Sequence, residues 1–155
     1  MERFFELNDL IVRAYRMKDY TTTEQLCNEY LKLAHQYIDN WNYGNAIHVA
    51  NIVLGLIAIE RNELENAKEF LVSAAMTPGS PQLKTFGPNM SLANELLKRG
   101  EKEIVLNYLK MCKSFWRWLF RISKVRKWQK QIKIRKIPDF KEHLLYYLME
   151  SPKKQ

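Results

Sequence analysis

The sequence predicts an all-α protein of six or seven antiparallel helices stacked as hairpins. Three observations support this fold class. Apolar residues recur every three or four positions along most of the chain, which is the spacing of an amphipathic helix. Only five glycines and five prolines occur in 155 residues, which suits helices better than a turn-rich β fold. A 38-residue duplication indicates stacked helix-turn-helix units.

The duplication extends over residues 44–118. Leu54-Gly55, Ala67, Leu71 and Ala74 recur 38 positions later as Leu92-Ala93, Val105, Leu109 and Cys112. Asn51 recurs as Asn89, and the turn Arg61-Asn62-Glu63 recurs as Arg99-Gly100-Glu101. Proteins built from such units are usually interaction scaffolds.

The first two helices are indicated by their apolar stripes. Phe4, Leu7 and Ala14 share one helical face and predict a helix that ends near Met17. A turn follows at residues 19–22, where a threonine is expected to cap the second helix, whose stripe includes Tyr30.

The third helix, expected at residues 45–61, is apolar in almost every direction. Such a helix is buried on most sides, so we expect it to be the central strut of the domain. Its apolar run, 49–59, is too short to span a bilayer. A fourth helix is expected at residues 64–76.

Residues 77–88 contain three prolines and two glycines, which predicts a fixed loop without helix. A fifth helix ending at Arg99 and a turn at Gly100 follow. The sixth helix begins at Glu101 and either continues or re-forms after a kink through residues 116–135. A short helix at about residues 140–149 completes a single domain, 1–155, with a repeat-like core at about 43–116 and a basic extension at 113–155.

A family resemblance follows from these residues. Leu54-Gly55, Ala67, Ala74 and Pro78 fall close to the small-residue and proline positions of a tetratricopeptide repeat. The segments Tyr43–His48, Thr77–Leu83 and Phe86–Ala93 resemble a group of small, uncharacterised bacterial tetratricopeptide-like proteins. This resemblance covers about residues 40–118 and implies a helical stack in the bacterial cytoplasm. It carries over no catalytic residue.

Composition limits the remaining function classes. Cys27 and Cys112 lie far apart without metal-ligand spacing, so we expect free thiols, no metal and no cofactor. The N-terminus has acidic residues and no apolar core of a signal peptide, which favours the cytoplasm.

A polar stripe on the third helix is the first candidate site. Asn45, His48 and Asn51 share one face of an otherwise apolar helix. One interpretation is that the stripe holds the loop at residues 77–89 to the core, because buried polar groups need partners. Alternatively, these residues line a ligand or peptide pocket together with Gln82 and Asn89. Catalysis by His48 is a third alternative, although no nucleophile or orienting carboxylate stands at a suitable spacing.

The basic segment is the second candidate. Residues 1–112 carry a net charge of −2, whereas residues 113–155 carry +10. Lys113, Arg117, Arg121 and Lys124 fall on one helical face, and Phe115, Trp118, Ile122 and Val125 on another, with Trp116 and Trp128 at the border. The other anion-binding candidates are Arg126, Lys127, Lys130 and Lys133.

We expect the apolar stripe to cap the repeats. The cations are either solvated or bind nucleic acid, an acidic protein or, with less support, a membrane surface. If the Trp/Phe-rich stripe of residues 115–128 is not buried within the chain, a homodimer would cover it.

Together, these features predict a non-enzymatic protein- or peptide-interaction module. The alternative is a nucleic-acid-associated protein that binds phosphates through residues 113–136.

Overall fold

A computed structural model of the chain describes residues 1–116 and 121–144, and all of their regular structure is helical. The α-helices are α1 (Glu2–Arg16), α2 (Tyr20–Ala34), α3 (Tyr43–Glu60), α4 (Leu64–Ala75), α5 (Pro81–Phe86), α6 (Ser91–Lys98), α7 (Lys102–Cys112) and α8 (Arg121–Lys133). Two short 3₁₀ helices, η1 (His35–Tyr37) and η2 (Lys141–His143), complete the set. The all-α prediction is therefore confirmed.

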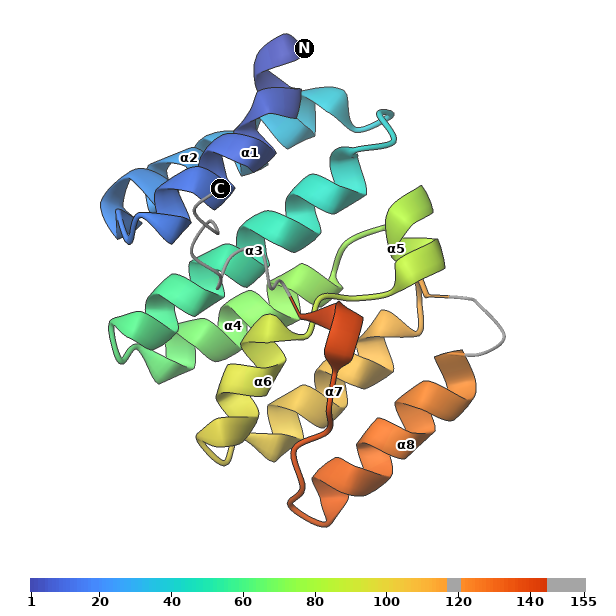
Figure 1. Cartoon of the computed structure of the whole chain (residues 1–155). Coiled ribbons are helices and arrows are strands. Elements are labelled where there is room, and N and C mark those ends of the chain that lie inside the picture. Colours follow the sequence, from blue (N-terminus) through green and yellow to red (C-terminus); the bar gives the residue numbers. More distant parts are fainter. Residues whose placement is uncertain (117–120, 145–155) are drawn as a thin grey trace, which may run out of the picture.

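The helices form a stack of hairpins. Short turns join α1 to α2, α3 to α4, and α6 to α7, and Figure 1 shows these pairs following one another from α1–α2 at one end to α8 at the other. Helix α3 packs against α2, α4 and α6, so it lies in the middle of the stack. This is the central position predicted from its apolar sequence.

One turn geometry closes four of the helices. Each is followed by a residue in the left-handed region: Lys18 (φ 57°), Asn62 (φ 56°), Gly100 (φ 80°) and Arg135 (φ 61°). In each case the next amide donates to the carbonyl five residues earlier, at 2.9–3.1 Å, as in a Schellman motif. Helices α1, α3, α6 and α8 therefore end alike. Two of these four turns, at Asn62 and Gly100, are the turns that the duplication relates.

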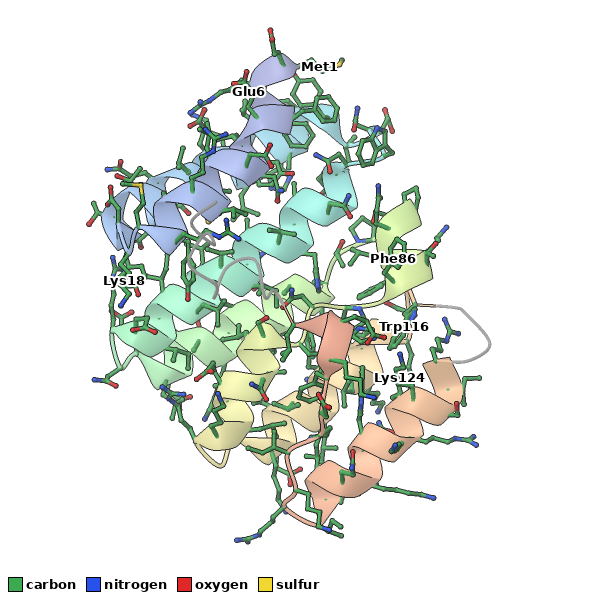
Figure 2. The ribbon with its side chains drawn as sticks, in the orientation of Figure 1. Met1, Glu6, Lys18, Phe86, Trp116 and Lys124 are labelled. Carbon is green, nitrogen blue, oxygen red and sulfur yellow. The ribbon has the colours of Figure 1, made fainter. Side chains whose placement is uncertain are left out.

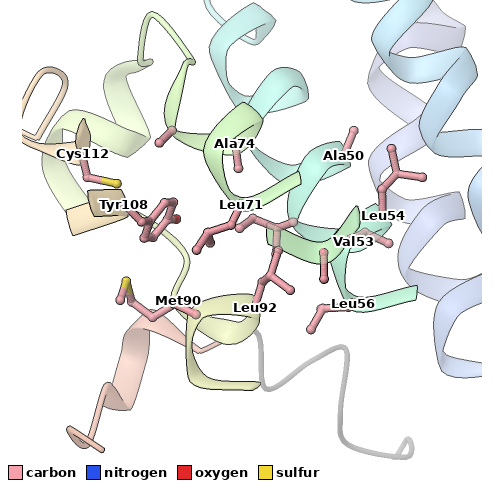
Figure 3. Packing of buried hydrophobic residues seen from close by; sticks show 14 of the residues in the cluster. Ala50, Val53, Leu54, Leu56, Leu71, Ala74, Met90, Leu92, Tyr108 and Cys112 are labelled. Atoms are coloured by element: carbon pink, nitrogen blue, oxygen red, sulfur yellow. The ribbon is translucent and has the colours of Figure 1, made fainter. Parts of the chain in front are cut away.

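The core explains why small residues recur. A Cβ on Gly55 of α3 would lie 2.1 Å from Cδ2 of Leu92 on α6, so the two helices approach closely only because this position has no side chain. Figure 3 shows Leu92 directed toward α3 and α4, where Val53 and Leu71 lie. By length and composition alone, the 18 residues of α3 could cross a membrane. This differs from the expectation based on the shorter apolar run at residues 49–59. However, 72% of α3 is buried inside the stack, as in a core helix.

Two local predictions are wrong. The segment 77–88 contains a helix, α5, because Pro81 stands at its first turn and the Ser80 hydroxyl accepts a hydrogen bond from the Leu83 amide. At the start of α2, the cap is Asp19 and not a threonine: its carboxylate accepts from the Thr22 amide at 3.1 Å.

The C-terminal segment re-forms a helix instead of continuing one. Helix α7 ends at Cys112, and α8 buries Val125, Trp128 and Ile132 against the stack. The predicted capping stripe is thus present in a different register, because Trp128 is buried whereas Ile122 is 46% exposed. Of the helix predicted at 140–149, η2 occupies 141–143, and residues 145–149 lie outside the described part of the chain.

Candidate functional site

His48 of α3 is buried and uses both ring nitrogens. Nδ1 lies 2.9 Å from the carbonyl oxygen of Ala74, and Nε2 lies 2.9 Å from the amide nitrogen of Asn89. A carbonyl only accepts and an amide N–H only donates, so Nδ1 carries the proton and Nε2 accepts. Burial lowers the pKa of His48 to about 4, and the ring is neutral near pH 7.

The segment that His48 holds, residues 88–90, is also held from two other sides. His143 of η2 donates from Nδ1 to the Pro88 carbonyl at 3.1 Å, and its own carbonyl accepts from the Met90 amide at 2.7 Å. The Tyr108 hydroxyl of α7 donates to the Asn89 carbonyl at 2.6 Å. Groups from α3, α7 and η2 therefore form hydrogen bonds with the backbone N–H and carbonyl groups of this non-helical segment. We call residues 88–90 the clamped segment.

The start of α3 holds the beginning of the same loop. A Cβ on Gly44 would lie 1.8 Å from the Gly79 carbonyl oxygen, so only glycine permits this approach. The Thr77 hydroxyl donates to the Gly44 carbonyl at 2.7 Å and accepts from the Gly79 amide at 3.1 Å.

Asn45 makes three side-chain hydrogen bonds, two of them to α5 and its capping residue. Its amide nitrogen donates to Asn42 Oδ1 at 3.1 Å and to Gln82 Oε1 at 3.3 Å. Its oxygen accepts a short bond from the Ser80 hydroxyl. Asn45, His48, Gln82 and Asn89 are therefore brought together, and their contacts agree with the interpretation that the stripe holds the loop.

Asn51 does not join this group. Its side-chain nitrogen donates to the Ile47 carbonyl of its own helix at 2.8 Å. The Asn51 side chain thus has its hydrogen-bond partner one turn earlier in α3. Asn51 is also not among the residues that line the cleft described next.

The cleft lies over this polar floor and has a volume of about 420 Å³. Its walls come from α1, the α2–α3 connection, α3, α5 and η2, and three of its aromatic side chains are exposed. Phe86 of α5 is 72% exposed, Trp41 53% and Phe5 37%, and the rings of Phe5 and Trp41 stack with centroids 6.0 Å apart. Figure 2 labels Phe86 at the α5 side of the stack.

The charged side chains that line the cleft are acidic, although one of them, Glu142, is paired with Lys124 at 3.1 Å. Asp9 and Glu142 are among the residues that line it, and no lysine or arginine is among them within the described residues. The whole chain carries +8. The sequence reasoning missed Asp9, Phe5, Trp41 and Phe86, because no spacing indicates that α1, the α2–α3 connection and α5 converge.

The basic candidates lie around α8. Lys113, Arg126, Lys127, Lys130 and Lys133 are exposed, whereas Arg121 and Lys124 are half-buried. Lys124 donates to Glu142 at 3.1 Å and lies 3.4 Å from His143 Nε2. Arg117 lies outside the described residues. The exposed basic surface thus differs from the face predicted through Lys113, Arg121 and Lys124.

The described aromatic side chains of the stripe behind the dimer prediction are covered by the chain itself, although Ile122 of the same stripe is 46% exposed. Phe115, Trp116, Val125 and Trp128 are buried, and Trp116 packs against Trp128 with ring centroids 6.1 Å apart. Trp118 and Phe120 lie outside the described residues.

Cys27 and Cys112 are free and buried; burial raises the pKa of Cys27 to about 12 and that of Cys112 still further. Residues 1–116 and 121–144 contain no group of three potential metal ligands. Comparison with protein-family models, curated proteins and solved structures finds no match.

Proposed function

We propose that this protein is a non-enzymatic peptide-interaction module of the bacterial cytoplasm, and that its cleft binds a cationic peptide segment. The observation that carries the proposal is the composition of the cleft: exposed aromatic rings and the carboxylate of Asp9, which makes no ion pair within the described chain, on a chain of net charge +8. The second carboxylate of the lining, Glu142, is paired with Lys124.

The aromatic residues favour a cationic side chain in particular. An ammonium or guanidinium group over an aromatic face gains about 0.5–1 kcal/mol at an exposed site and about 2 kcal/mol when desolvated. Trp41 and Phe86 offer such faces, and Asp9 supplies a counter-charge at the same rim.

Polar side chains suited to a peptide backbone are also present. Asn8 and the amide nitrogen of Gln82 line the cleft and make no hydrogen bond to the rest of the described chain. Amide groups of this kind pair with backbone carbonyl and N–H groups. The rigid floor, built by His48 and the clamped segment, lowers the cost of ordering the site on binding.

The same floor argues against catalysis by His48. A general base needs a free nitrogen within hydrogen-bond reach of its substrate. Both nitrogens of His48 are bonded to backbone groups, at 2.9 Å each.

The test uses two pools of fluorescein-labelled nine-residue random peptides, one with lysine or arginine at alternate positions and one with aspartate or glutamate there. We expect the cationic pool to raise the fluorescence anisotropy on addition of protein, although overall electrostatics would favour the acidic pool. Trp41→Ala should weaken binding about tenfold, equivalent to about 1.4 kcal/mol. Stronger binding of the acidic pool would contradict the proposal.

Asp9→Asn and Glu6→Gln provide a matched pair. Both remove one carboxylate from an exposed position of α1, but only Asp9 lines the cleft. We expect Asp9→Asn to weaken binding of the cationic pool and Glu6→Gln to leave it unchanged. An equal loss in the two variants would show that only net charge matters, and would refute a defined site.

A further inference from the structure

The outer surface of α8 carries a band of cations without counter-charges. Its members are Arg126, Lys127, Lys130, Lys133, Arg135 and Lys136, all exposed and without an ion pair to any described carboxylate. We call these six residues the basic band. Like charges spaced along one helix repel each other, and an anionic partner would relieve that repulsion.

The sequence supplies no neighbouring acids to offset the band. Residues 104–138 contain eleven lysines and arginines and no aspartate or glutamate. Helix C-termini favour cations, which accounts for Lys133 and the residues just after it. The dipole of α8 does not account for Arg126 and Lys127 nearer its start.

The fold adds cations from a second element. A pocket of about 330 Å³ lies between the α6–α7 turn and the end of α8, and Lys98, Lys102, Arg135 and Lys136 line it over an apolar floor that includes Ile132. Lys98 lies 2.9 Å from Glu95, and Lys102 lies 3.8 Å from Glu103. Both ion pairs are solvent-exposed, where such pairs contribute about 0–1 kcal/mol, so an anionic ligand can displace them.

We propose that the basic band binds the phosphate backbone of double-stranded DNA, with α8 lying in the major groove and the pocket holding phosphates at one end. Helix α8 has 13 residues and is therefore about 20 Å long. The band has six cations, so we expect it to neutralise about six phosphates.

The geometry disfavours the other anionic partners. A membrane-surface helix inserts its apolar face, but α8 buries Val125, Trp128 and Ile132 within the protein. Single-stranded nucleic acid stacks on aromatic side chains, and the basic band contains none. Duplex RNA has a deep, narrow major groove that does not admit a helix, unlike that of B-DNA.

The position of α8 makes this docking sterically possible. It is the last helix of the stack in Figure 1, and its outer side is not covered by another described helix. None of the six cations belongs to the peptide cleft, so DNA binding would be independent of the proposed peptide function.

The test is fluorescence anisotropy with a labelled, mixed-sequence DNA duplex of 20 base pairs between 50 and 200 mM KCl. If about six phosphates are neutralised, log K should fall with log[salt] with a slope of about −5, which corresponds to about a thousandfold loss over this range. No binding at 50 mM, or a slope near zero, would overturn the proposal.

A matched pair of triple variants separates the band from net charge. Arg126→Gln/Lys130→Gln/Lys133→Gln removes three charges from α8, and Lys18→Gln/Lys32→Gln/Lys84→Gln removes three exposed, unpaired charges elsewhere in the described chain. We expect only the α8 variant to reduce the slope, by about 3. An equal reduction in both would refute a defined interface.

Three further arms identify the partner and the pocket. A duplex RNA of the same length, polyglutamate and vesicles containing phosphatidylserine should each bind more weakly than DNA at 100 mM KCl, and tighter binding of any of them would overturn the assignment to DNA. Arg135→Gln/Lys136→Gln should reduce the slope of log K against log[salt] by about 2. An unchanged slope would show that the pocket at the end of α8 does not bind phosphates. Trp41→Ala should leave DNA binding intact, so failure of the peptide proposal would leave this one standing.

Discussion

The neutral, doubly bonded state of His48 makes stability depend on pH in a calculable way. The pKa of His48 is about 4 in the folded protein and about 6.5 when unfolded. Between these values the unfolded chain binds a proton that the folded chain does not, so the free energy of unfolding falls as the pH is lowered. Protonation would also place a second N–H against the Asn89 amide, which needs an acceptor.

The magnitude follows from the two pKa values. One unit of pKa corresponds to about 1.4 kcal/mol, so His48 alone should remove about 2 kcal/mol of stability between pH 7 and pH 5, and about 3 kcal/mol by pH 4. The interval from pH 7 to pH 5 reports on histidine more specifically, because carboxylates protonate mainly below pH 5. The pKa of His143 is also lowered, chiefly by burial, so the whole protein should lose more than His48 contributes.

Urea unfolding at pH 7, 6 and 5 measures this slope, and His48→Gln removes the titrating group. We expect the wild type to lose about 2 kcal/mol more than His48→Gln over this range. If His48→Gln does not fold, NMR of the imidazole nitrogens in the wild type gives the same information: the Nδ1–H tautomer should persist unchanged from pH 7 to pH 5. A ring that titrates near 6.5, or equal slopes in the two proteins, would refute the reasoning.

Three further experiments test the packing. Gly44→Ala should lower the free energy of unfolding by about 3 kcal/mol, because the new Cβ would meet the Gly79 carbonyl. Gly100→Ala should lower it by only about 1–2 kcal/mol, because Gly100 has φ 80° but open space around it. Equal losses in urea titrations would contradict the close approach at Gly44. Leu92→Ala should lower the free energy of unfolding by about 3–5 kcal/mol. Adding Gly55→Ala should recover part of that loss, because the new methyl group enters the space that Leu92 vacates. Strict additivity of the two substitutions in a double-mutant cycle would argue against the contact. Cys27 and Cys112 should react with a thiol reagent at pH 8 only at the rate of unfolding, and fast modification of the native protein would show that burial does not protect them.

Much of the site's framework is visible in the sequence because it depends on local spacing. Asn45 and His48 share a helical face, and the loop rich in proline and glycine is an evident supply of backbone partners. Asn51 shares that face too, but a single turn of helix offers it the Ile47 carbonyl, and spacing alone cannot distinguish this from a tertiary contact. His143 lies 95 positions after His48, and nothing local indicates that both hold the clamped segment.

The basic surface shows that helical spacing does not predict which residues share a face when the helix is interrupted. The single face predicted for Lys113, Arg121 and Lys124 holds only if one helix continues through them, but α7 ends at Cys112 and α8 begins at Arg121. Angular relations do not carry across such a break: Arg121 and Lys124 are half-buried, whereas Lys113 is exposed, as are Arg126, Lys130 and Lys133. The approach of Lys98 and Lys102 to the end of α8 depends on how the hairpins stack, which local pattern does not encode.

The clamped segment has a consequence for how the molecule unfolds. Arrays of repeats lose order from their ends, one unit at a time, because each unit contacts only its neighbours. Here residues 88–90 are bonded to α3, α7 and η2 at once, so the segment joins units that are distant in the chain. Opening it disrupts several hairpins together. We therefore expect the stack to melt in a single cooperative transition, with the amide protons of Asn89 and Met90 among the slowest to exchange with solvent.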